Sequence, residues 1–153
     1  RHLPVLSKLG YRTVALDSSR KLLKTARPKT SHSLLGDARR LPLLDDSFDA
    51  VIFIAALHHI EDKNERKDAL TEAFRVTREG GCILISVWAP PGREASGHSF
   101  VPWTRNDGVV FQRYYYFYSE KELANDIQSS DFSKSPKIQM EKSGQNIWAF
   151  IIV

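Results

Sequence analysis

Three places in this sequence combine polar residue types and spacings that could do chemistry. Asp17 and Asp37 each follow a short apolar run, and the pair His58-His59 follows a longer one. In an open parallel α/β sheet, ligands bind outside the carboxyl ends of the strands, so polar residues directly after apolar runs are expected to face a ligand. The stretch 34–60 therefore predicts half of a pocket for a nucleotide-type cofactor.

A fourth group of candidate residues lies in the aromatic and basic segment that follows Trp88. Exposed Trp and Tyr side chains can stack on an unpaired base, and Arg binds phosphate or carboxylate through a planar fork. The alternative is an aromatic strand whose rings only pack, but the spaced basic residues favour ligand binding. The candidates for substrate binding are Trp88, Trp103, Arg105, Arg113, Tyr114 and Tyr115.

Alternating helix and strand patterns must position these residues. Helical spacing covers residues 1–10, 18–26, 64–78 and 119–127, and strand patterns cover 11–16, 31–35, 48–56 and 82–88, with a hairpin of 137–141 and 147–153. Gly80-Gly81 is expected to end the third helix. The nearly unbroken apolar run Ala50 to Ala56 predicts a central strand buried on both faces. We therefore expect a doubly wound, mostly parallel α/β sheet, with an irregular insertion over residues 89–118.

Composition narrows the class of protein. The 153 residues fit one domain, and 22 basic against 18 acidic side chains give a pI near 9.3. Residues 1–40 hold ten basic and two acidic side chains, which either a solvated helix face or nucleic-acid contact explains. The lone Cys82 cannot form an internal disulfide or a zinc site of its own. No apolar run approaches membrane-spanning length, so we expect no membrane partner and a cytoplasmic location.

The first motif set resembles the S-adenosylmethionine-dependent methyltransferases of the doubly wound class. It consists of Gly-Asp-Ala at 36–38, Leu-Pro at 41–42, Ser-Phe-Asp at 47–49 and Leu-His-His at 57–59. The resemblance implies S-adenosylmethionine as cofactor, with its ribose hydroxyls on Asp17 next to Ser18. It further implies that Asp37 and Ala38 border the adenine, and that Ala55, Ala56, Leu57 and the two histidines floor the methionine end. Taken alone, Asp17 could instead start the following helix as an N-cap.

A second motif set is more discriminating. Val101-Pro102-Trp103 and the segment from Arg113-Tyr114-Tyr115 to Leu123 resemble the tRNA methyltransferases that esterify carboxymethylated wobble uridine. Tyr116 stands where that family has His. The resemblance implies a tRNA anticodon loop as substrate, 5-carboxymethyluridine as the methylated residue, and a small zinc-binding activator subunit as partner. We expect that subunit to add to the strand near residues 31–35, the weaker edge.

These residues suggest a mechanism for methyl transfer to a carboxylate. The acceptor is already ionised at neutral pH, so the site needs alignment and water exclusion rather than a strong base. We hypothesise that Arg113 anchors the carboxylate or a nearby phosphate and that Trp103 or Tyr115 stacks on the base. One of His58 and His59 lines the methyl-transfer channel, and the other is structural.

The family's first strand and its glycine-rich loop do not precede the helix at residues 1–10. We therefore expect this chain to be an N-terminally trimmed version of a methyltransferase domain. Two other functions stay open: a methyltransferase for small molecules, which has no reason to carry the second motif set, and a catalytically silent methyltransferase-like subunit, which the missing loop suggests.

Overall fold

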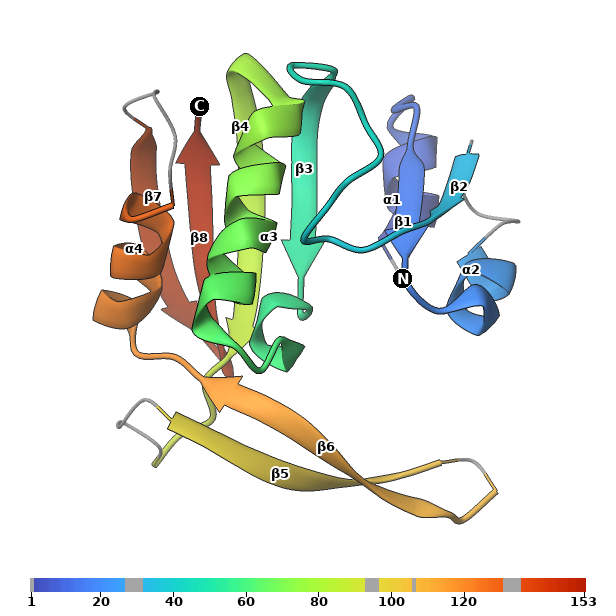
Figure 1. Cartoon of the computed structure of the whole chain (residues 1–153), viewed down its shortest axis with the longest axis vertical. Helices are drawn as coiled ribbons and strands as arrows, with labels where there is room; N and C mark the ends of the chain where they lie inside the picture. The colour runs from blue at the N-terminus through green and yellow to red at the C-terminus, as the bar shows by residue number, and fades with distance from the viewer. Residues whose placement is uncertain (1, 27–31, 93–96, 106, 131–135) are drawn as a thin grey trace. The chain divides into compact units, whose positions relative to one another are not determined.

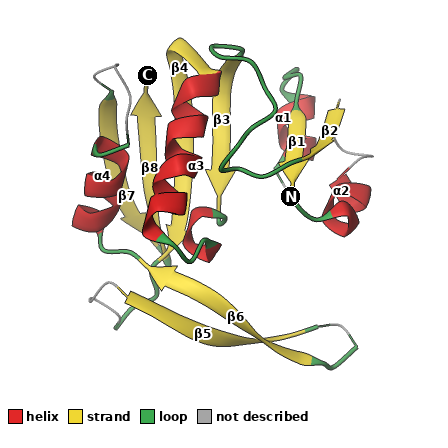
Figure 2. Cartoon of the chain, in the orientation of Figure 1, coloured by secondary structure: helices red, strands yellow, loops and turns green. Residues whose placement is uncertain are grey.

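The computed structural model describes residues 2–26, 32–92, 97–105, 107–130 and 136–153. The chain divides into two compact units, Arg1–Pro42 and Leu43–Val153, and each unit is described by itself. Figure 1 labels the elements of both units, and Figure 2 marks which parts are helix, strand and loop.

The first unit is a small parallel β-α-β arrangement preceded by a helix. Its elements are α1 (Leu3–Lys8), β1 (Val14–Asp17), α2 (Arg20–Ala26) and β2 (His32–Leu35). β1 pairs in parallel with β2, from Val14 opposite His32 to Asp17 opposite Leu35. All four elements were predicted, although β1 begins three residues later than expected, after Gly10 turns the chain with a φ of 83°. Arg1 and Ser31, where two of the predictions began, lie outside the described residues.

The second unit holds a four-stranded sheet in the order β3-β4-β8-β7. β3 and β4 are parallel, whereas β8 is antiparallel to both β4 and β7, so the predicted C-terminal hairpin is confirmed. The elements are β3 (Phe48–Ile54), the 3-10 helix η2 (Leu57–His59), α3 (Lys63–Val76), β4 (Thr77–Trp88), β5 (Gly97–Thr104), β6 (Val110–Phe117), α4 (Glu120–Gln128), β7 (Lys137–Ser143) and β8 (Asn146–Ile152).

The core of the second unit lies between one face of this sheet and the helices α3 and α4, which Figure 1 shows side by side over the strands. Alternate residues of the strands point into it because side chains alternate along a strand. Its fully buried apolar residues are Leu57, Leu70, Ile83, Ile85, Val87, Leu123, Ile127, Ala149 and Ile151.

The prediction that residues 50–56 form a central strand buried on both faces was wrong for this unit. β3 stands at the end of the four-stranded sheet, and Ile52 is 41% exposed. Phe150 and Ile152 of β8 are also exposed. An apolar run therefore identified the strand correctly but not its place in the sheet.

The third helix ends two residues before the predicted boundary, at Val76. Thr77 is extended, and its Oγ1 donates a hydrogen bond to the carbonyl of Ala73 at 2.7 Å, which satisfies one of the unpaired carbonyls of the last turn. Gly80 and Gly81 therefore lie inside β4 rather than at a helix end. A Cβ on Gly81 would come within 2.9 Å of the Asp49 carbonyl oxygen, so only glycine fits this approach of the two strands.

The predicted irregular insertion is instead largely a hairpin. β5 and β6 pair antiparallel from Gly97 opposite Phe117 to Thr104 opposite Val110, and we call this hairpin the arm. The aromatic and β-branched residues of the segment favour strands, and Gly108, at a φ of 82°, permits the turn. The substrate candidates on the arm are therefore held on a paired sheet, where alternate residues share a face.

The first testable prediction concerns the start of α3. The Asp62 carboxylate accepts hydrogen bonds from the backbone N–H groups of Asn64 and Glu65, at 2.8 and 3.0 Å. Asp62→Ala should therefore lower the free energy of unfolding by about 1 kcal/mol, measured by urea denaturation. Asp68→Ala removes an exposed carboxylate from the middle of the same helix and should change it by less than about 0.5 kcal/mol. Equal effects of the two variants would contradict the capping role.

Candidate functional site

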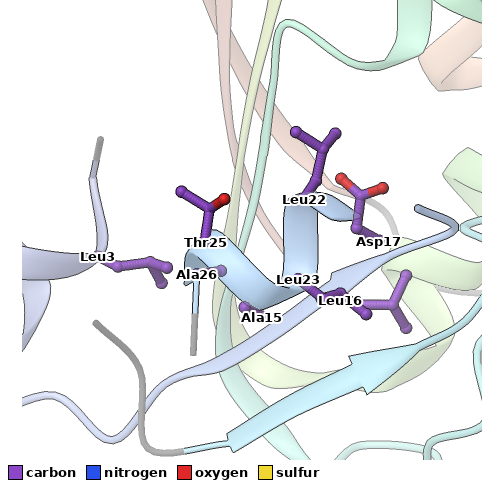
Figure 3. Close-up of a pocket in the computed structure, with 8 residues that line it drawn as sticks. All are labelled: Leu3, Ala15, Leu16, Asp17, Leu22, Leu23, Thr25 and Ala26. Carbon is purple, nitrogen blue, oxygen red and sulfur yellow. The ribbon is translucent and has the colours of Figure 1, made fainter. Parts of the chain in front are cut away.

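The first unit contains a hollow of about 270 Å³ at the end of β1. Its lining is mostly apolar, and Figure 3 shows the Asp17 carboxylate beside Leu22 at one end of it and Leu3 at the other. The remaining lining residues are Ala15, Leu16, Leu23, Thr25 and Ala26. Asp17 is the last residue of β1, at the carboxyl end where open α/β sheets bind ligands, and its role in a ligand site stays a prediction.

Asp17 serves the local fold as well. Its Oδ1 accepts a hydrogen bond from the N–H of Ser19 at 2.8 Å, and the Ser19 hydroxyl accepts one from the N–H of Leu22 at 3.4 Å, so Ser19 caps α2. Ser18 lies between them in the turn. A carboxylate has two oxygens, so this contact leaves Oδ2 to accept from a ligand, and the two interpretations of Asp17 are compatible.

Asp37 and Ala38 lie in a tight turn after β2. The N–H of Arg40 donates to the Asp37 carbonyl at 3.1 Å, and the Arg39 Nε donates to both carboxylate oxygens, at 2.9 and 3.0 Å. The side-chain hydrogen bonds from Arg39 are the largest cause that holds the pKa of Asp37 below its ordinary value. Asp37 is therefore ionised at neutral pH, and a ligand that binds it competes with Arg39.

In the second unit, a strained turn ends β3. Ala55 has a φ of 52°, a left-handed conformation that is unfavourable for a residue with a Cβ. Its N–H donates to the Ser86 carbonyl at 3.0 Å, which ties the turn to β4. Ala56 follows, and η2 then carries the two histidines. Leu57 is fully buried and belongs to the core of this unit, so its place on the floor of a pocket stays a prediction.

His58 is the buried histidine of the pair. It is 2% exposed, and its Nδ1 accepts a hydrogen bond from the backbone N–H of Trp88 at 3.0 Å, which joins the end of β3 to the end of β4. Because Nδ1 is an acceptor, the neutral ring carries its proton on Nε2. Burial, followed by the neighbouring His59, lowers the pKa of His58 to about 3.

His59 is exposed and has the opposite tautomer. Its Nδ1 lies 3.0 Å from the carbonyl oxygen of Tyr114 on β6, and because a carbonyl only accepts, Nδ1 carries the proton. Nε2 of the neutral ring is then an acceptor. The pKa of His59 is lower than the ordinary histidine value of 6.5. Partial burial is the main cause, the hydrogen bond to the Tyr114 carbonyl opposes it, and the charge of Arg113 adds to it.

The ring of Tyr115 joins the histidines to the base of the arm. It stacks on His58 at 5.2 Å between ring centroids and meets His59 and Trp88 edge-on at 4.5 and 4.9 Å. Trp88 also donates from Nε1 to Gln145 at 3.1 Å. The sequence did not show that Trp88 and Tyr115, which it proposed as separate substrate contacts, form one ring cluster with the histidines.

Farther along the arm, the guanidinium of Arg113 lies over the ring of Trp103, 4.3 Å from its centroid. Trp103 is 40% exposed. Arg105 forms an ion pair with Asp107, and its guanidinium lies 5.3 Å from the centroid of the Phe111 ring. The predicted substrate residues Trp103, Arg105 and Arg113 are therefore all on the arm, and Arg113 lies on an aromatic face, with no ion pair to another residue that the structure describes.

Arg66 is a residue of the site that the sequence analysis missed. It is 2% exposed, and its Nη1 donates to the carbonyls of Ile60 and Glu61 at 3.1 and 2.8 Å, in the connection between η2 and α3. Its guanidinium lies 3.9 Å from the centroid of Tyr116, whose hydroxyl donates to Glu122. Burial and then this bond raise the pKa of Tyr116 to about 12. Its place on the apolar stripe of α3 was the available signal.

Residues 1–85 match the family described as "Methyltransferase domain". The chain belongs to this family. It is 40% identical over 83 residues to the tRNA (carboxymethyluridine(34)-5-O)-methyltransferase of Arabidopsis thaliana, an alignment that covers 54% of this chain and 20% of the relative. It is 34% identical over 96 residues to the human "Probable tRNA methyltransferase 9B", covering 61% and 21%. The chain thus spans about a fifth of each of these relatives.

Solved structures extend the similarity to the whole fold. An S-adenosylmethionine-dependent methyltransferase of Methanosarcina mazei aligns with a TM-score of 0.70 at 18% identity, over 97% of this chain and 83% of its own. This confirms the predicted Rossmann-like methyltransferase fold. S-adenosylmethionine is the cofactor of the family. Asp17, Ser18, Asp37 and Ala38 lie in the first unit and Ala55, Ala56 and Leu57 in the second, and their joint role in cofactor binding stays a prediction.

The second testable prediction concerns acid stability. The unfolded state takes up a proton on His58 near pH 6.5, whereas the folded state does so only near pH 3, so this residue contributes stability at neutral pH that is lost as the pH falls between these values. The loss should reach roughly 2–3 kcal/mol by pH 4.5.

Urea denaturation at pH 7.0, 5.5 and 4.5 checks this prediction. His58→Asn keeps an acceptor for the Trp88 N–H but does not titrate, so its stability should fall less steeply with acid than that of the wild type. Parallel pH dependences would show that His58 is protonated without cost and would contradict the buried neutral ring.

Proposed function

We propose that the protein containing this chain is a tRNA methyltransferase that transfers a methyl group from S-adenosylmethionine to the carboxylate of 5-carboxymethyluridine at the wobble position. The observation that carries the proposal is the arm, which links Arg113 on Trp103 to Tyr115 in the histidine cluster. Arg113 and Tyr115 are two residues apart on β6, so their side chains share one face of the strand.

The charge on this face suits an anionic acceptor. Arg113 is exposed, its guanidinium lies on a flat ring, and its charge acts on His59. A guanidinium stacked on Trp is pre-oriented and still offers its in-plane N–H donors to a carboxylate or phosphate. Exposed Trp103 and Phe111 beside it offer surfaces on which bases can stack, as proteins that bind single-stranded RNA do.

The proposed methyl transfer requires the protein mainly to align the reacting groups. When bound, the cofactor supplies an electrophilic methyl group on a sulfonium. The acceptor carboxylate is already ionised at neutral pH, so no residue of this chain would have to remove a proton from it. The work of this chain is to hold the carboxylate with Arg113, to exclude water with the ring cluster, and to orient the base.

The residues present fit the cofactor. Asp17 faces a mostly apolar hollow with one oxygen engaged by Ser19, which suits a ribose that donates from its hydroxyls. Asp37 is an ionised acceptor in the adjoining turn, and Arg39 would have to yield one of its bonds to an adenine amino group.

The proposal includes a small zinc-binding activator subunit and a cytoplasmic location. β2 pairs with β1 in the two-stranded sheet of the first unit, and the proposal keeps β2 as the strand to which the subunit adds. No helix in the described part of the chain is long and apolar enough to cross a membrane. A methyltransferase for small molecules, or a catalytically silent subunit, would explain the fold but not the pairing of Arg113 with Trp103.

The third testable prediction separates cofactor binding from helix capping at Asp17. Asp17→Asn keeps an oxygen for the Ser19 N–H but loses the charge, so it should preserve folding and weaken S-adenosylmethionine binding by roughly 10- to 100-fold. Titration calorimetry measures the affinity. Asp68→Asn on α3 is the matched control and should bind like the wild type. Unchanged affinity in Asp17→Asn would place the cofactor elsewhere.

The fourth testable prediction concerns Arg113. Arg113→Lys keeps the charge but loses the planar fork and its fit on Trp103, so methyl-ester formation should fall at least about 10-fold if the fork anchors the acceptor. Nucleoside mass spectrometry on tRNA from cells that lack the enzyme gives the rate. Arg78→Lys is the control: it changes an exposed arginine of β4 that forms an ion pair with Asp49 of β3, and it should leave the rate unchanged.

A rate in Arg113→Lys within twofold of the wild type would assign Arg113 a general electrostatic role. Equal turnover of small phenols or acids by the wild type, or ester formation that does not depend on the carboxymethyl group, would overturn the tRNA assignment and favour the small-molecule methyltransferase.

A further inference from the structure

We propose that His59 determines the base specificity of the reaction, because its Nε2 accepts a hydrogen bond from the N3–H of a uracil ring and thereby selects uracil over cytosine. This inference rests on the proposed function. It assigns to the exposed histidine a part in recognition that is separate from anchoring the carboxylate.

The tautomer of His59 follows from its contact with the arm. The Tyr114 carbonyl, 3.0 Å from Nδ1, can only accept, so the proton of the neutral ring is on Nδ1 and the lone pair is on Nε2. The ring is held on two further sides, by Tyr115 edge-on at 4.5 Å and by His58 at 4.5 Å between centroids. It cannot turn over to exchange its nitrogens without breaking the bond to Tyr114.

An acceptor at this position is the wrong partner for a carboxylate. A lone pair repels an anion, so His59 does not hold the acceptor group, and the nearby Arg113 remains as its anchor. Protonation would make Nε2 a donor, but the shifted pKa keeps the ring neutral at pH 7. The chemistry of the exposed nitrogen therefore calls for a substrate group that carries a hydrogen.

The two pyrimidines differ at this group. Uracil carries a hydrogen on N3, whereas cytosine has a lone pair there and would meet Nε2 acceptor to acceptor. Once the bound base covers Nε2, two acceptors left facing each other are expected to lower transfer by roughly 10- to 100-fold. His58 cannot do the same, because it is 2% exposed and its Nδ1 is already bonded to the Trp88 N–H.

The experiment compares three anticodon stem-loop RNAs that carry a 5-carboxymethyl pyrimidine at the wobble position: uridine, its N3-methyl derivative, and cytidine. The full-length enzyme is assayed with S-adenosylmethionine, and kcat and KM are measured for each RNA. The wild type should methylate the uridine RNA with a kcat/KM roughly 10- to 100-fold above that of the other two.

His59→Gln is the decisive variant. A glutamine amide turns to present either its oxygen or its NH₂, so it can accept from uracil or donate to cytosine, and the uridine-to-cytidine ratio of kcat/KM should shrink to within a few-fold. A merely structural histidine would lower both rates together and leave the ratio unchanged. His2→Gln, the same replacement at an exposed position in the first unit, is the control and should keep the wild-type ratio.

Each outcome decides one claim. No ester on the uridine RNA from a folded, cofactor-binding wild type overturns the proposed function itself. Ester formation on all three RNAs at similar rates, or an unchanged ratio in His59→Gln, overturns the role of His59 while the proposed function stands. Selection of uridine by the wild type, lost in His59→Gln and kept in His2→Gln, supports the inference.

Discussion

The hydrogen bond from the Trp88 N–H to Nδ1 of His58 is the contact on which the second unit's site depends. It joins the ends of β3 and β4 at the point where each leaves the sheet, and it fixes the tautomer of a ring that is otherwise buried. Tyr115 stacks on that ring, so the position of β6 follows from it. His59 donates a hydrogen bond to the carbonyl of Tyr114, the residue before Tyr115. Two adjacent histidines thus take opposite tautomers because one bonds a donor and the other an acceptor.

The arm is attached to the sheet unit by contacts at its base, and each of these contacts uses a different kind of interaction. Rings pack around Tyr115, the guanidinium of Arg66 lies under Tyr116, and the Tyr114 carbonyl bonds His59. The outer part of the arm leaves Phe100, Trp103 and Phe111 exposed. Under the proposed function, this division between a packed base and an open end lets the arm present Arg113 to the substrate while the base keeps its contacts with the histidines.

Much of this could be predicted from the sequence, because local signals were strong. The helices, the strands and the C-terminal hairpin follow from apolar period, caps and glycines. Apart from the helix end predicted at Gly80-Gly81, the wrong predictions concern features that depend on contacts between distant parts of the chain. An apolar run does not tell a central strand from one at the end of a sheet, as β3 shows. Residues 97–117 were predicted to be irregular because a turn separates two short strands. These strands are recognised only from their pairing with each other. The different surroundings of His58 and His59 depend on contacts with Trp88 and Tyr114, 30 and 55 residues away in the chain, and which of the two lines the channel stays a prediction.

Arg66 shows why the connection between η2 and α3 has the shape that it has. Its Nε and the Oε2 of Glu122 are buried and have no hydrogen-bond partner among the described residues, so this charge is not held by an optimised ion pair. A buried guanidinium in this situation costs desolvation, which two backbone carbonyls and the Tyr116 face only partly offset. An apolar side chain of similar size would avoid that cost but would leave the Ile60 and Glu61 carbonyls without their donor. Arg66 therefore has a positioning role that offsets its desolvation cost. It holds Ile60 and Glu61, which follow His59, next to β6, and the Tyr114 carbonyl of β6 sets the tautomer of His59.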